Sequence, residues 1–176
     1  MFGRLAALVV LLATAPLLAI IAFAVWFEDR GQVLFRQIRV GQYGRPFTIY
    51  KLRSMRQDQT GISLTCAGDP RVTRIGRFLR AWKLDELPQL WNIARGEMGW
   101  IGPRPEVPEF VDPENPLWQQ VLQLRPGLAD AATFRFRNET QLLAEASDPG
   151  DCYRHEILPH KLRLSIEHSR RRSPSR

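Results

Sequence analysis

The sequence predicts an α+β protein that is mostly helical, with a small β-hairpin or sheet, behind an N-terminal membrane helix. Three observations predict this class. No residue from Leu5 to Phe27 is charged, and residues 32–53 read as two short strands around a turn. In much of the remainder, apolar residues recur at helical spacing. A length of 176 residues suffices for one compact domain and an anchor.

The charge balance narrows the class of partner. A formal net charge of +7 favours nucleic acid, an anionic membrane surface or a phosphorylated substrate. Nucleic acid is disfavoured, because the sequence contains no recognition module and a membrane anchor would be an odd companion. Cys66 and Cys152 lie far apart, which argues against a zinc ribbon or a disulfide framework. A reducing, cytoplasmic environment is the simpler interpretation.

The apolar N-terminal segment is long enough, at roughly 35 Å as a helix, to cross a bilayer core. It is also longer than the apolar region of a signal peptide, so we expect it to be retained. Pro16 lies near its middle and predicts a bend. Arg4 precedes the segment, and Arg30, Arg36 and Arg39 follow it, which fits both ends on the cytoplasmic side. A kinked single-pass helix and a re-entrant helix broken at Pro16 both remain open.

The remaining pattern suggests three parts: a membrane-anchoring segment 1–29, a globular domain 30–168 and a basic, irregular tail 169–176. Within the globular part we first expect a hairpin over Gln32–Arg53, a loop 56–70 and a basic amphipathic helix bearing Val72, Ile75, Leu79 and Trp82. A second helix should run from Asp85 or Glu86 to Arg95, where Gly96 ends it. After it we expect a structured loop 96–116, a short helix Pro116–Leu124, a loop and strand 125–138, and helices over 139–146 and 153–168. The arginines between residues 71 and 80 form either a solvated face or a surface for anionic headgroups.

The adjacent acids Asp85 and Glu86 are the first candidate for chemistry. Asp85 is a good N-cap and Pro88 is tolerated in a first helical turn, so simple helix capping is one interpretation. In a basic domain, however, two carboxylates also suit Mg²⁺, which shares oxygen ligands with substrate phosphates. An aspartate in this place could also serve as a nucleophile on phosphorus.

Arginine-containing motifs provide the second candidate. In Gly102-Pro103-Arg104-Pro105, two prolines fix the backbone on either side of one guanidinium, which favours binding of a phosphate or a planar base. In 134–138 aromatic and arginine residues alternate, so we expect a strand that presents Arg135 and Arg137 on one face, either as a phosphate clamp or as an exposed strand.

Together these motifs make the chain recognisable. It resembles the bacterial sugar transferase family, specifically the small monotopic phosphoglycosyl transferases. The motifs that carry the resemblance are the proline-broken N-terminal helix, 51–55 (KLRSM), 69–80 (DPRVTRIGRFLR), 84–90 (LDELPQL), 102–105 (GPRP), 125–127 (RPG) and 157–162 (ILPHKL). Several ordered motifs at consistent separations are far more specific than any one of them.

The resemblance implies a reaction in which a UDP-sugar and undecaprenyl phosphate give a polyprenyl-diphosphate sugar and UMP. It implies that Asp85 is the nucleophile, that Glu86, with Asp85, holds Mg²⁺, and that Arg80 organises the site. It further implies that Pro103, Arg104 and Pro105 contact the nucleotide. The remaining substrate-binding residues that we expect are Arg137, Lys51 and Arg53.

The resemblance also implies a re-entrant helix at the bacterial inner membrane, with residues 30–168 as a catalytic domain on the cytoplasmic face. Membrane lipids would then be partners, and downstream glycosyltransferases would act on the product.

Two departures from the family pattern stand out. Ala15 replaces a frequent serine before Pro16, although Thr14 could substitute for it in satisfying backbone groups. Ala129-Asp130 replaces a usual Thr-Gly, which adds a negative charge near the expected phosphate site. Two other functions stay open: a catalytically inactive, membrane-anchored binding module, and a glycosyltransferase that releases UDP. The sequence identifies neither the sugar, nor the glycan pathway, nor the oligomeric state.

Overall fold

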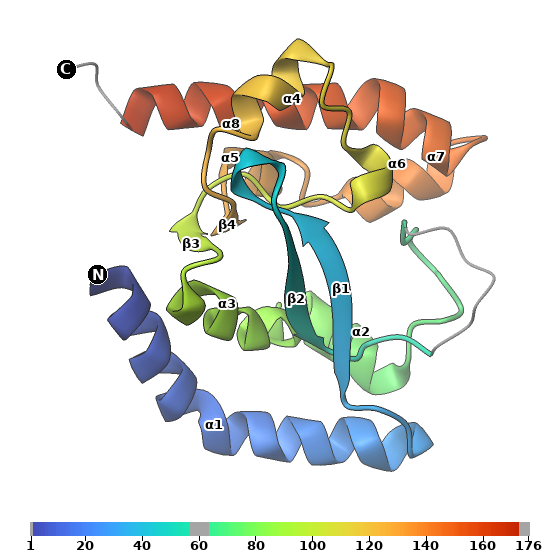
Figure 1. Cartoon of the computed structure of the whole chain (residues 1–176). Helices are drawn as coiled ribbons and strands as arrows, with labels where there is room; N and C mark the ends of the chain where they lie inside the picture. The colour runs from blue at the N-terminus through green and yellow to red at the C-terminus, as the bar shows by residue number, and fades with distance from the viewer. Residues whose placement is uncertain (1, 57–63, 173–176) are drawn as a thin grey trace. The chain divides into compact units, whose positions relative to one another are not determined.

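The computed structural model describes residues 2–56 and 64–172, and it confirms an α+β protein in which helices predominate over small sheets (Figure 1). The chain divides into two compact units. Unit 1 comprises Met1–Ile38, Thr48–Gln59 and Pro70–Glu97, and unit 2 comprises Arg39–Phe47, Thr60–Asp69 and Met98–Arg176. The expected division at residues 29 and 168 stays a prediction.

The first helix of unit 1, α1 (Phe2–Asp29), is 28 residues long and contains Pro16. It is hydrogen-bonded as one helix, yet its axis changes direction partway along (Figure 1). Two features explain a bend. Pro16 has no N–H to donate to the preceding turn, and the Thr14 hydroxyl donates to the carbonyl oxygens of Val10 at 2.8 Å and Leu11 at 3.2 Å. Thr14 thus bonds to carbonyl groups of the preceding turn, whereas the carbonyl that loses its usual N–H partner at Pro16 is that of Leu12. The expected substitution of Thr14 for the family's serine stays a prediction.

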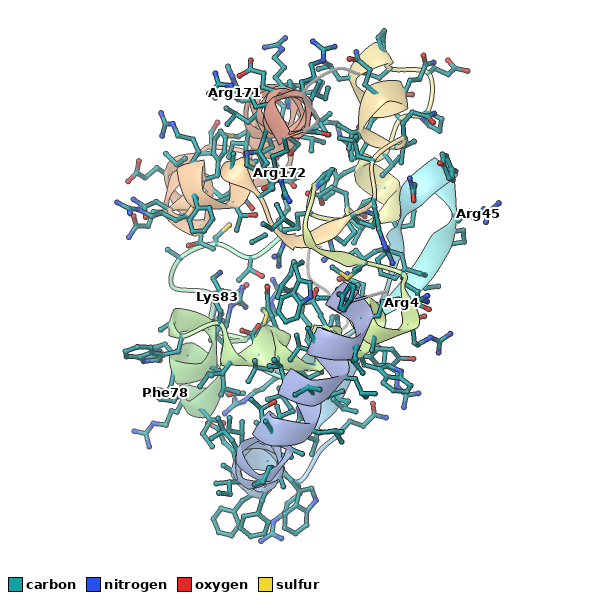
Figure 2. All side chains as sticks on the ribbon, turned by 90° about the vertical axis from the view of Figure 1, so that its left-hand side faces the viewer. Arg4, Arg45, Phe78, Lys83, Arg171 and Arg172 are labelled. Atoms are coloured by element: carbon teal, nitrogen blue, oxygen red, sulfur yellow. The ribbon has the colours of Figure 1, made fainter. Side chains whose placement is uncertain are left out.

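Both ends of α1 contact the rest of unit 1. At the first turn, Arg4 donates to the carbonyl oxygens of Ala94 and Arg95 (Arg4 is labelled in Figure 2). At the last turn, Glu28 accepts from the backbone N–H of Arg74 at 2.8 Å. Between these ends α1 carries a largely uncovered apolar surface, and it is the one described helix that is long and apolar enough to cross a membrane.

The expected hairpin is confirmed. Strand β1 (Leu34–Val40) pairs with β2 (Pro46–Leu52), and the 3₁₀ turn η1 (Gln42–Gly44) joins them. Gly44 has a φ of 72°, a left-handed conformation that glycine adopts without steric cost. The division between the two units falls within β1 and again before Thr48.

The remainder of unit 1 places its helices around a small apolar core. It contains α2 (Arg74–Ala81), the 3₁₀ helix η2 (Leu84–Gln89) and α3 (Leu90–Arg95). Ile21, Val25, Leu52 and Leu79 are buried together, so α1, β2 and α2 share one core. Thr73 caps α2 by accepting from Gly76 N, and Gly96 ends α3 with a φ of 85°, as expected.

Unit 2 is built on a short parallel sheet and a set of helices. Its elements after residue 98 are β3 (Gly99–Ile101), η3 (Pro108–Phe110), α4 (Pro116–Val121), β4 (Gly127–Ala129), α5 (Ala131–Arg135), α6 (Glu139–Glu145), α7 (Pro149–Cys152), the π-helical turn η4 (Tyr153–Ile157) and α8 (Leu158–Arg172). β3 and β4 pair in parallel, with Gly99 opposite Gly127. A cluster of buried side chains from η3, α4, α6, η4 and α8 forms the core.

Three local predictions are wrong. The first concerns residues 134–138, which form the end of α5 and a turn instead of a strand. The reason is a capping box, in which the Asp130 side chain accepts from Thr133 N at 2.8 Å while the Thr133 side chain interacts with Asp130 N. Helix initiation at this point overrides the alternation of aromatic and arginine residues.

Asp85 is also not an N-cap, because it is the second residue of η2 and Lys83 occupies the N-cap position. The third error lies in the tail: α8 continues to Arg172, four residues into the segment expected to be irregular, and 173–176 lie outside the described residues. The expected loop 56–70 likewise falls partly outside them, at 57–63.

Candidate active site

The acid pair of unit 1 sits on η2 in a buried setting. Asp85 and Glu86 are only 7% and 8% exposed. Lys83, which precedes η2, has a φ of 56°, a left-handed conformation that costs a lysine roughly 1–2 kcal/mol. Backbone strain of this kind is typical of functional sites, where the surrounding structure maintains it. The sequence between α2 and α3 therefore turns sharply in order to bury two adjacent carboxylates.

Asp85 carries the clearest sign of a reactive or ligand-binding group. Its Oδ1 atom is buried and has no hydrogen-bond partner. Burial raises the pKa of Asp85 above its ordinary value, and the charge of Glu86 adds to the rise, although Lys51, Arg80 and Lys83 oppose it. An unsatisfied buried carboxylate oxygen is costly unless a cation or substrate engages it, so this position points to function.

Glu86 is oriented by a lysine from the hairpin. Lys51, on β2, lies with Nζ 3.3 Å from Glu86 Oε1. The fully buried Asn92 keeps η2 and α3 in register with β2, because its Nδ2 donates to Thr48 O at 2.7 Å and its Oδ1 accepts from Tyr50 N at 3.3 Å. The ammonium of Lys51 and the two carboxylates of η2 are therefore brought to one place in unit 1.

Arg80 and Arg53 are held by other contacts. Arg80 Nη1 lies 3.0 Å from Met55 Sδ, and its charge acts on Asp85. Close packing of α2 on the end of β2 makes this approach feasible: a Cβ added to Gly76 would lie 1.9 Å from Ser54 O. Arg53 is buried and forms an ion pair with Asp29, the last residue of α1. Its predicted role in substrate binding stays a prediction.

In unit 2 the Pro103–Pro105 loop is pinned by its neighbours. Gly102 N donates to Ala129 O at 3.1 Å, and Gly127 N donates to Pro103 O at 2.9 Å. Neither glycine has room for a side chain, since a Cβ on Gly127 would lie 2.1 Å from Gly102 N. Both prolines are buried, whereas Arg104 is partly exposed. The loop thus presents one guanidinium from a fixed backbone.

Two further features of unit 2 concern the other predicted residues. Arg137 is exposed in the turn between α5 and α6. A cavity of about 270 Å³ lies beside Pro103 and is lined also by His168 and by Arg125 and Arg172, whose guanidinium groups suit an anionic group. Asp130 contributes to its wall, but both carboxylate oxygens are engaged, one by Thr133 N and the other by the Ser165 hydroxyl. The added negative charge at residue 130 is accounted for by helix capping.

Sequence reasoning missed two buried polar positions that build the site. Asn92 was counted only as part of a helix, although a fully buried asparagine needs partners and so signals a structural junction. Glu106, directly after the Pro103–Pro105 loop, is also buried and was not singled out. At both positions, a polar residue between apolar neighbours was the sequence signal that could have revealed a buried polar side chain.

The acid pair could hold a divalent cation. Within residues 2–56 and 64–172, no group of three or more His, Cys, Asp or Glu side chains is arranged to hold a metal. Asp85 Oδ1 nevertheless lacks a partner beside a second carboxylate, which fits Mg²⁺, a cation that keeps water and substrate phosphate in most of its coordination sphere.

Comparison with known proteins decides the family. A family model for bacterial sugar transferases matches residues 1–158. The chain belongs to the bacterial sugar transferase family. Most of the motifs named above, the acid pair, the Arg104 loop and the N-terminal helix among them, lie within the matched range.

Curated relatives share parts of this sequence. An undecaprenyl-phosphate glucose phosphotransferase of Komagataeibacter xylinus is 48% identical over 61% of this chain and 21% of its own length. A UDP-glucose:undecaprenyl-phosphate glucose-1-phosphate transferase of Caulobacter vibrioides is 45% identical over 69% of this chain and 47% of its own length. A UDP-N-acetylgalactosamine-undecaprenyl-phosphate N-acetylgalactosaminephosphotransferase of Aeromonas hydrophila is 42% identical over 71% of this chain and 31% of its own length. The chain thus spans about a fifth to a half of the length of these relatives.

Proposed function

We propose that this sugar transferase moves a sugar-1-phosphate from a UDP-sugar to undecaprenyl phosphate and releases UMP. The observation that carries the proposal is the buried acid pair, in which Asp85 keeps an unpartnered oxygen and Glu86 is paired with Lys51. The names of three relatives, which act on undecaprenyl phosphate with glucose or N-acetylgalactosamine donors, support the reaction class. Because those donors differ, the sugar is left open.

In the first step, a carboxylate oxygen of Asp85 attacks the β-phosphorus of the donor. The new bond is an acyl-phosphate, the bond from that phosphorus to the bridging oxygen breaks, and UMP departs with the bridging oxygen. Lys51 and Arg80 offset the negative charge that gathers around Asp85, in keeping with their opposing effect on its pKa. Arg104 is the proposed contact to the nucleotide.

In the second step, a phosphate oxygen of the lipid attacks the same phosphorus and frees the Asp85 carboxylate. A covalent intermediate lets a soluble donor and a membrane-bound acceptor use one site in turn. Glu86, with Asp85, would hold Mg²⁺, which when bound neutralises charge on the phosphate oxygens. The carboxylate of Glu86 is already oriented by Lys51, so little side-chain entropy remains to be lost on binding.

The membrane arrangement follows from α1. Arg4 and Glu28, near opposite ends of the helix, both contact unit 1, which favours a helix that enters and leaves the same membrane face. We propose that this face is the cytoplasmic side of the bacterial inner membrane, where the lipid phosphate would be presented to the acid pair. Phe78 and Trp82 of the α2 region are exposed and would suit the membrane interface (Phe78 is labelled in Figure 2).

The decisive experiment measures the nucleotide that purified protein releases from a panel of UDP-sugars, with undecaprenyl phosphate and Mg²⁺. UMP is expected, and Asp85→Asn is expected to abolish its release. Asp112→Asn, a change at an exposed acid far along the sequence, is the matched control and should keep full turnover. Full turnover by Asp85→Asn would exclude it as the nucleophile.

The same assay separates the two other functions. Release of UDP instead of UMP would indicate direct glycosyl transfer. Binding of lipid without release of either nucleotide from any donor would indicate an inactive binding module. The covalent step has its own readout: quenched reactions lacking the lipid should yield a protein heavier by one phosphosugar, and the adduct should be absent in Asp85→Asn.

A further inference from the structure

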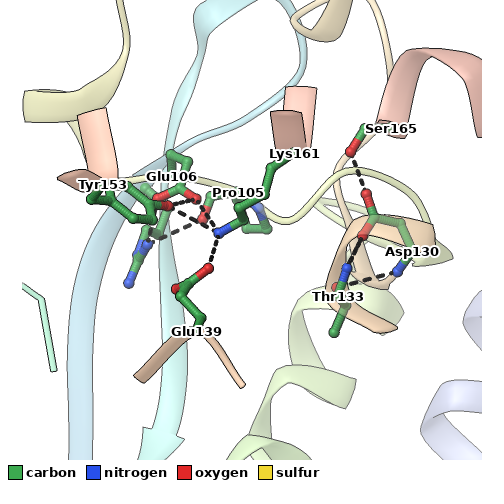
Figure 3. Close-up of polar contacts among 9 residues, drawn as sticks. Pro105, Glu106, Asp130, Thr133, Glu139, Tyr153, Lys161 and Ser165 are labelled. Atoms are coloured by element: carbon green, nitrogen blue, oxygen red, sulfur yellow. Dashed lines mark hydrogen bonds and ion pairs between the residues drawn. The ribbon is translucent and has the colours of Figure 1, made fainter. Parts of the chain in front are cut away.

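A buried polar network in unit 2 has no role in the chemistry proposed above. Figure 3 shows its members around Glu106, which lies two residues after Arg104. The Tyr153 hydroxyl donates to Glu106 Oε1 at 2.6 Å, and Lys161 Nζ lies 3.5 Å from the same oxygen. Arg39 Nη1 lies 3.6 Å from Glu106 Oε2. Three donors from different parts of the chain therefore converge on one carboxylate.

The network continues beyond Glu106. Lys161 also binds Glu139 at 2.9 Å and the Tyr153 oxygen at 3.0 Å. Burial by itself would raise the pKa of Glu106, but the charges of Lys161, Arg39 and Arg104 and the hydrogen bond from Tyr153 together lower the pKa, so the carboxylate stays charged. Burial, followed by the charge of Glu106, raises the pKa of Tyr153 well above its ordinary value, so the hydroxyl stays a donor.

Arg39 of this network and the adjacent Val40 hold the backbone on the carboxyl side of Arg104. Arg39 Nη1 donates to Pro105 O at 3.2 Å, and Val40 N donates to Glu106 O at 2.9 Å. On the amino side of Arg104, the hydrogen bonds from β4 to Gly102 and Pro103 hold the backbone in the same way. The backbone on both sides of Arg104 is thus fixed by hydrogen bonds to its neighbours.

Stability alone is a weak reason to bury so many charges. Replacing a buried ion pair by apolar residues is often neutral or stabilising, because the desolvation of the charges offsets their attraction. Tyr153 also begins the π-helical turn η4, and π-helical turns occur frequently at functional sites. A network that is costly to bury and is attached to one loop fits a role in holding that loop.

We propose that Glu106, Tyr153 and Lys161 are positioning residues that set the direction of the Arg104 guanidinium. The proposal rests on the function proposed above, in which Arg104 contacts the nucleotide of the donor. A rigid arginine binds with less loss of conformational entropy than a mobile one, so the network acts on donor affinity. It leaves the acid pair and the lipid step unaltered.

Tyr153→Phe tests this with little disturbance, because it removes one hydroxyl and keeps the buried ring. We expect the KM for the UDP-sugar to rise about fivefold to tenfold, as for partial loss of one charge-assisted hydrogen bond, with kcat nearly unchanged. Leu143→Ala is the control for stability, since Leu143 belongs to the same apolar cluster as Tyr153 and has no polar group that could join the network. It should lower the melting temperature without raising the KM.

A double-mutant cycle asks whether the effect passes through Arg104. Arg104→Lys keeps the charge but replaces a planar fork by a flexible ammonium, so directed presentation is already lost. In that background Tyr153→Phe should leave the KM unchanged. An equal rise in both backgrounds, or no rise in either, would overturn the proposal.

A second readout does not require turnover. In spectra of arginine Nε–H groups, the Arg104 signal is the one that disappears in Arg104→Lys. We expect it to shift and narrow towards the mobile limit in Tyr153→Phe and to stay in place in Leu143→Ala. An unchanged Arg104 signal in Tyr153→Phe would contradict the positioning role even if the protein released UMP normally. A shifted signal in a protein that released no UMP would instead overturn only the proposed function.

Discussion

The Nε atom of Arg4 donates to the carbonyl oxygen of Ala94 at 3.2 Å, which ties the first turn of α1 to the last turn of α3. The last turns of helices carry unsatisfied carbonyl groups, and a cation there also interacts favourably with the helix dipole. At the other end of α1, Glu28 accepts from the first N–H groups of α2. One apolar helix thus begins and ends against the same unit.

This arrangement predicts that both ends of α1 are on one side of the membrane. A single cysteine placed at the exposed Phe2, in a chain with Cys66 and Cys152 replaced by serine, should be protected from a membrane-impermeant maleimide in intact spheroplasts. The cysteine at residue 2 should react after permeabilisation. A chain that keeps only Cys66 should also react after permeabilisation. Labelling of Phe2→Cys from outside would establish a single-pass helix instead. Pro16→Leu, which restores the missing N–H, should shift labelling towards the outside.

The second prediction concerns the pH dependence contributed by Asp85. The folded protein raises the pKa of Asp85, chiefly through burial, so the native state binds this proton more tightly than the unfolded chain does. Between the ordinary value of 3.8 and the raised pKa, stability therefore falls as pH rises. Above the raised pKa the full cost of the buried charge is present.

Asp85→Asn should consequently unfold at a higher temperature than the unmodified protein at pH 7, measured with a chelator present. The gain should shrink as the pH falls through the raised pKa. Activity depends on pH in the opposite sense, because the nucleophile must be ionised. As the pH is lowered, kcat/KM should therefore begin to fall at a higher pH than it would with an aspartate of ordinary pKa. Equal melting temperatures for the two proteins at every pH would contradict this account.

The sequence predicted the elements whose signals are local. Gly96 ended α3, and the alternation of residues 47–52 identified β2, because each depends on neighbours along the chain. The strand expected at 134–138 failed because Asp130 and Thr133 start a helix, a competition that periodicity alone does not resolve. The residue types around Asp85 predict a cap, because the left-handed turn at Lys83 is not visible in them.

The site shows the same division. The acid pair and Arg104 were found from their motifs, whereas the groups that hold them were not. Asn92 and Glu106 act through partners 44 and 55 residues away, Thr48 and Lys161 respectively. Contacts at such separations depend on tertiary packing, so a single sequence gives no direct sign of them.

The third prediction tests the close packing of α2 on the end of β2. Gly76→Ala would place a methyl group 1.9 Å from Ser54 O, and backbone must move to relieve the overlap. We expect a loss of about 1–3 kcal/mol in unfolding free energy, typical of overpacking. Activity should fall as well, because the shift moves Arg80 relative to Asp85. Gly99→Ala is the control: its added carbon would meet no atom closer than 3.5 Å, so neither stability nor activity should change appreciably.

The last prediction concerns the acid side of stability and Glu106. Its pKa is lowered in the folded protein, because Lys161, Arg39, the Tyr153 hydrogen bond and Arg104 together outweigh the effect of burial. For such a group the stabilising contribution is complete above the unfolded value of 4.5 and is lost as the pH falls through the folded pKa. Glu106→Gln should therefore cost up to roughly 3–5 kcal/mol near neutral pH, the range for breaking a buried pair, and progressively less in acid.

Denaturant unfolding of both proteins between pH 3 and pH 7 measures this difference, with a range chosen to bracket the ordinary pKa of a glutamate. Glu109→Gln provides the matched control, since Glu109 is an exposed acid three residues along the chain and undergoes the same chemical change. The two substitutions should differ strongly near neutral pH and converge in acid, because protonated Glu106 no longer attracts Lys161 and Arg39. A constant cost across the range would mean that Glu106 stabilises the fold through shape and hydrogen bonding, independent of its charge.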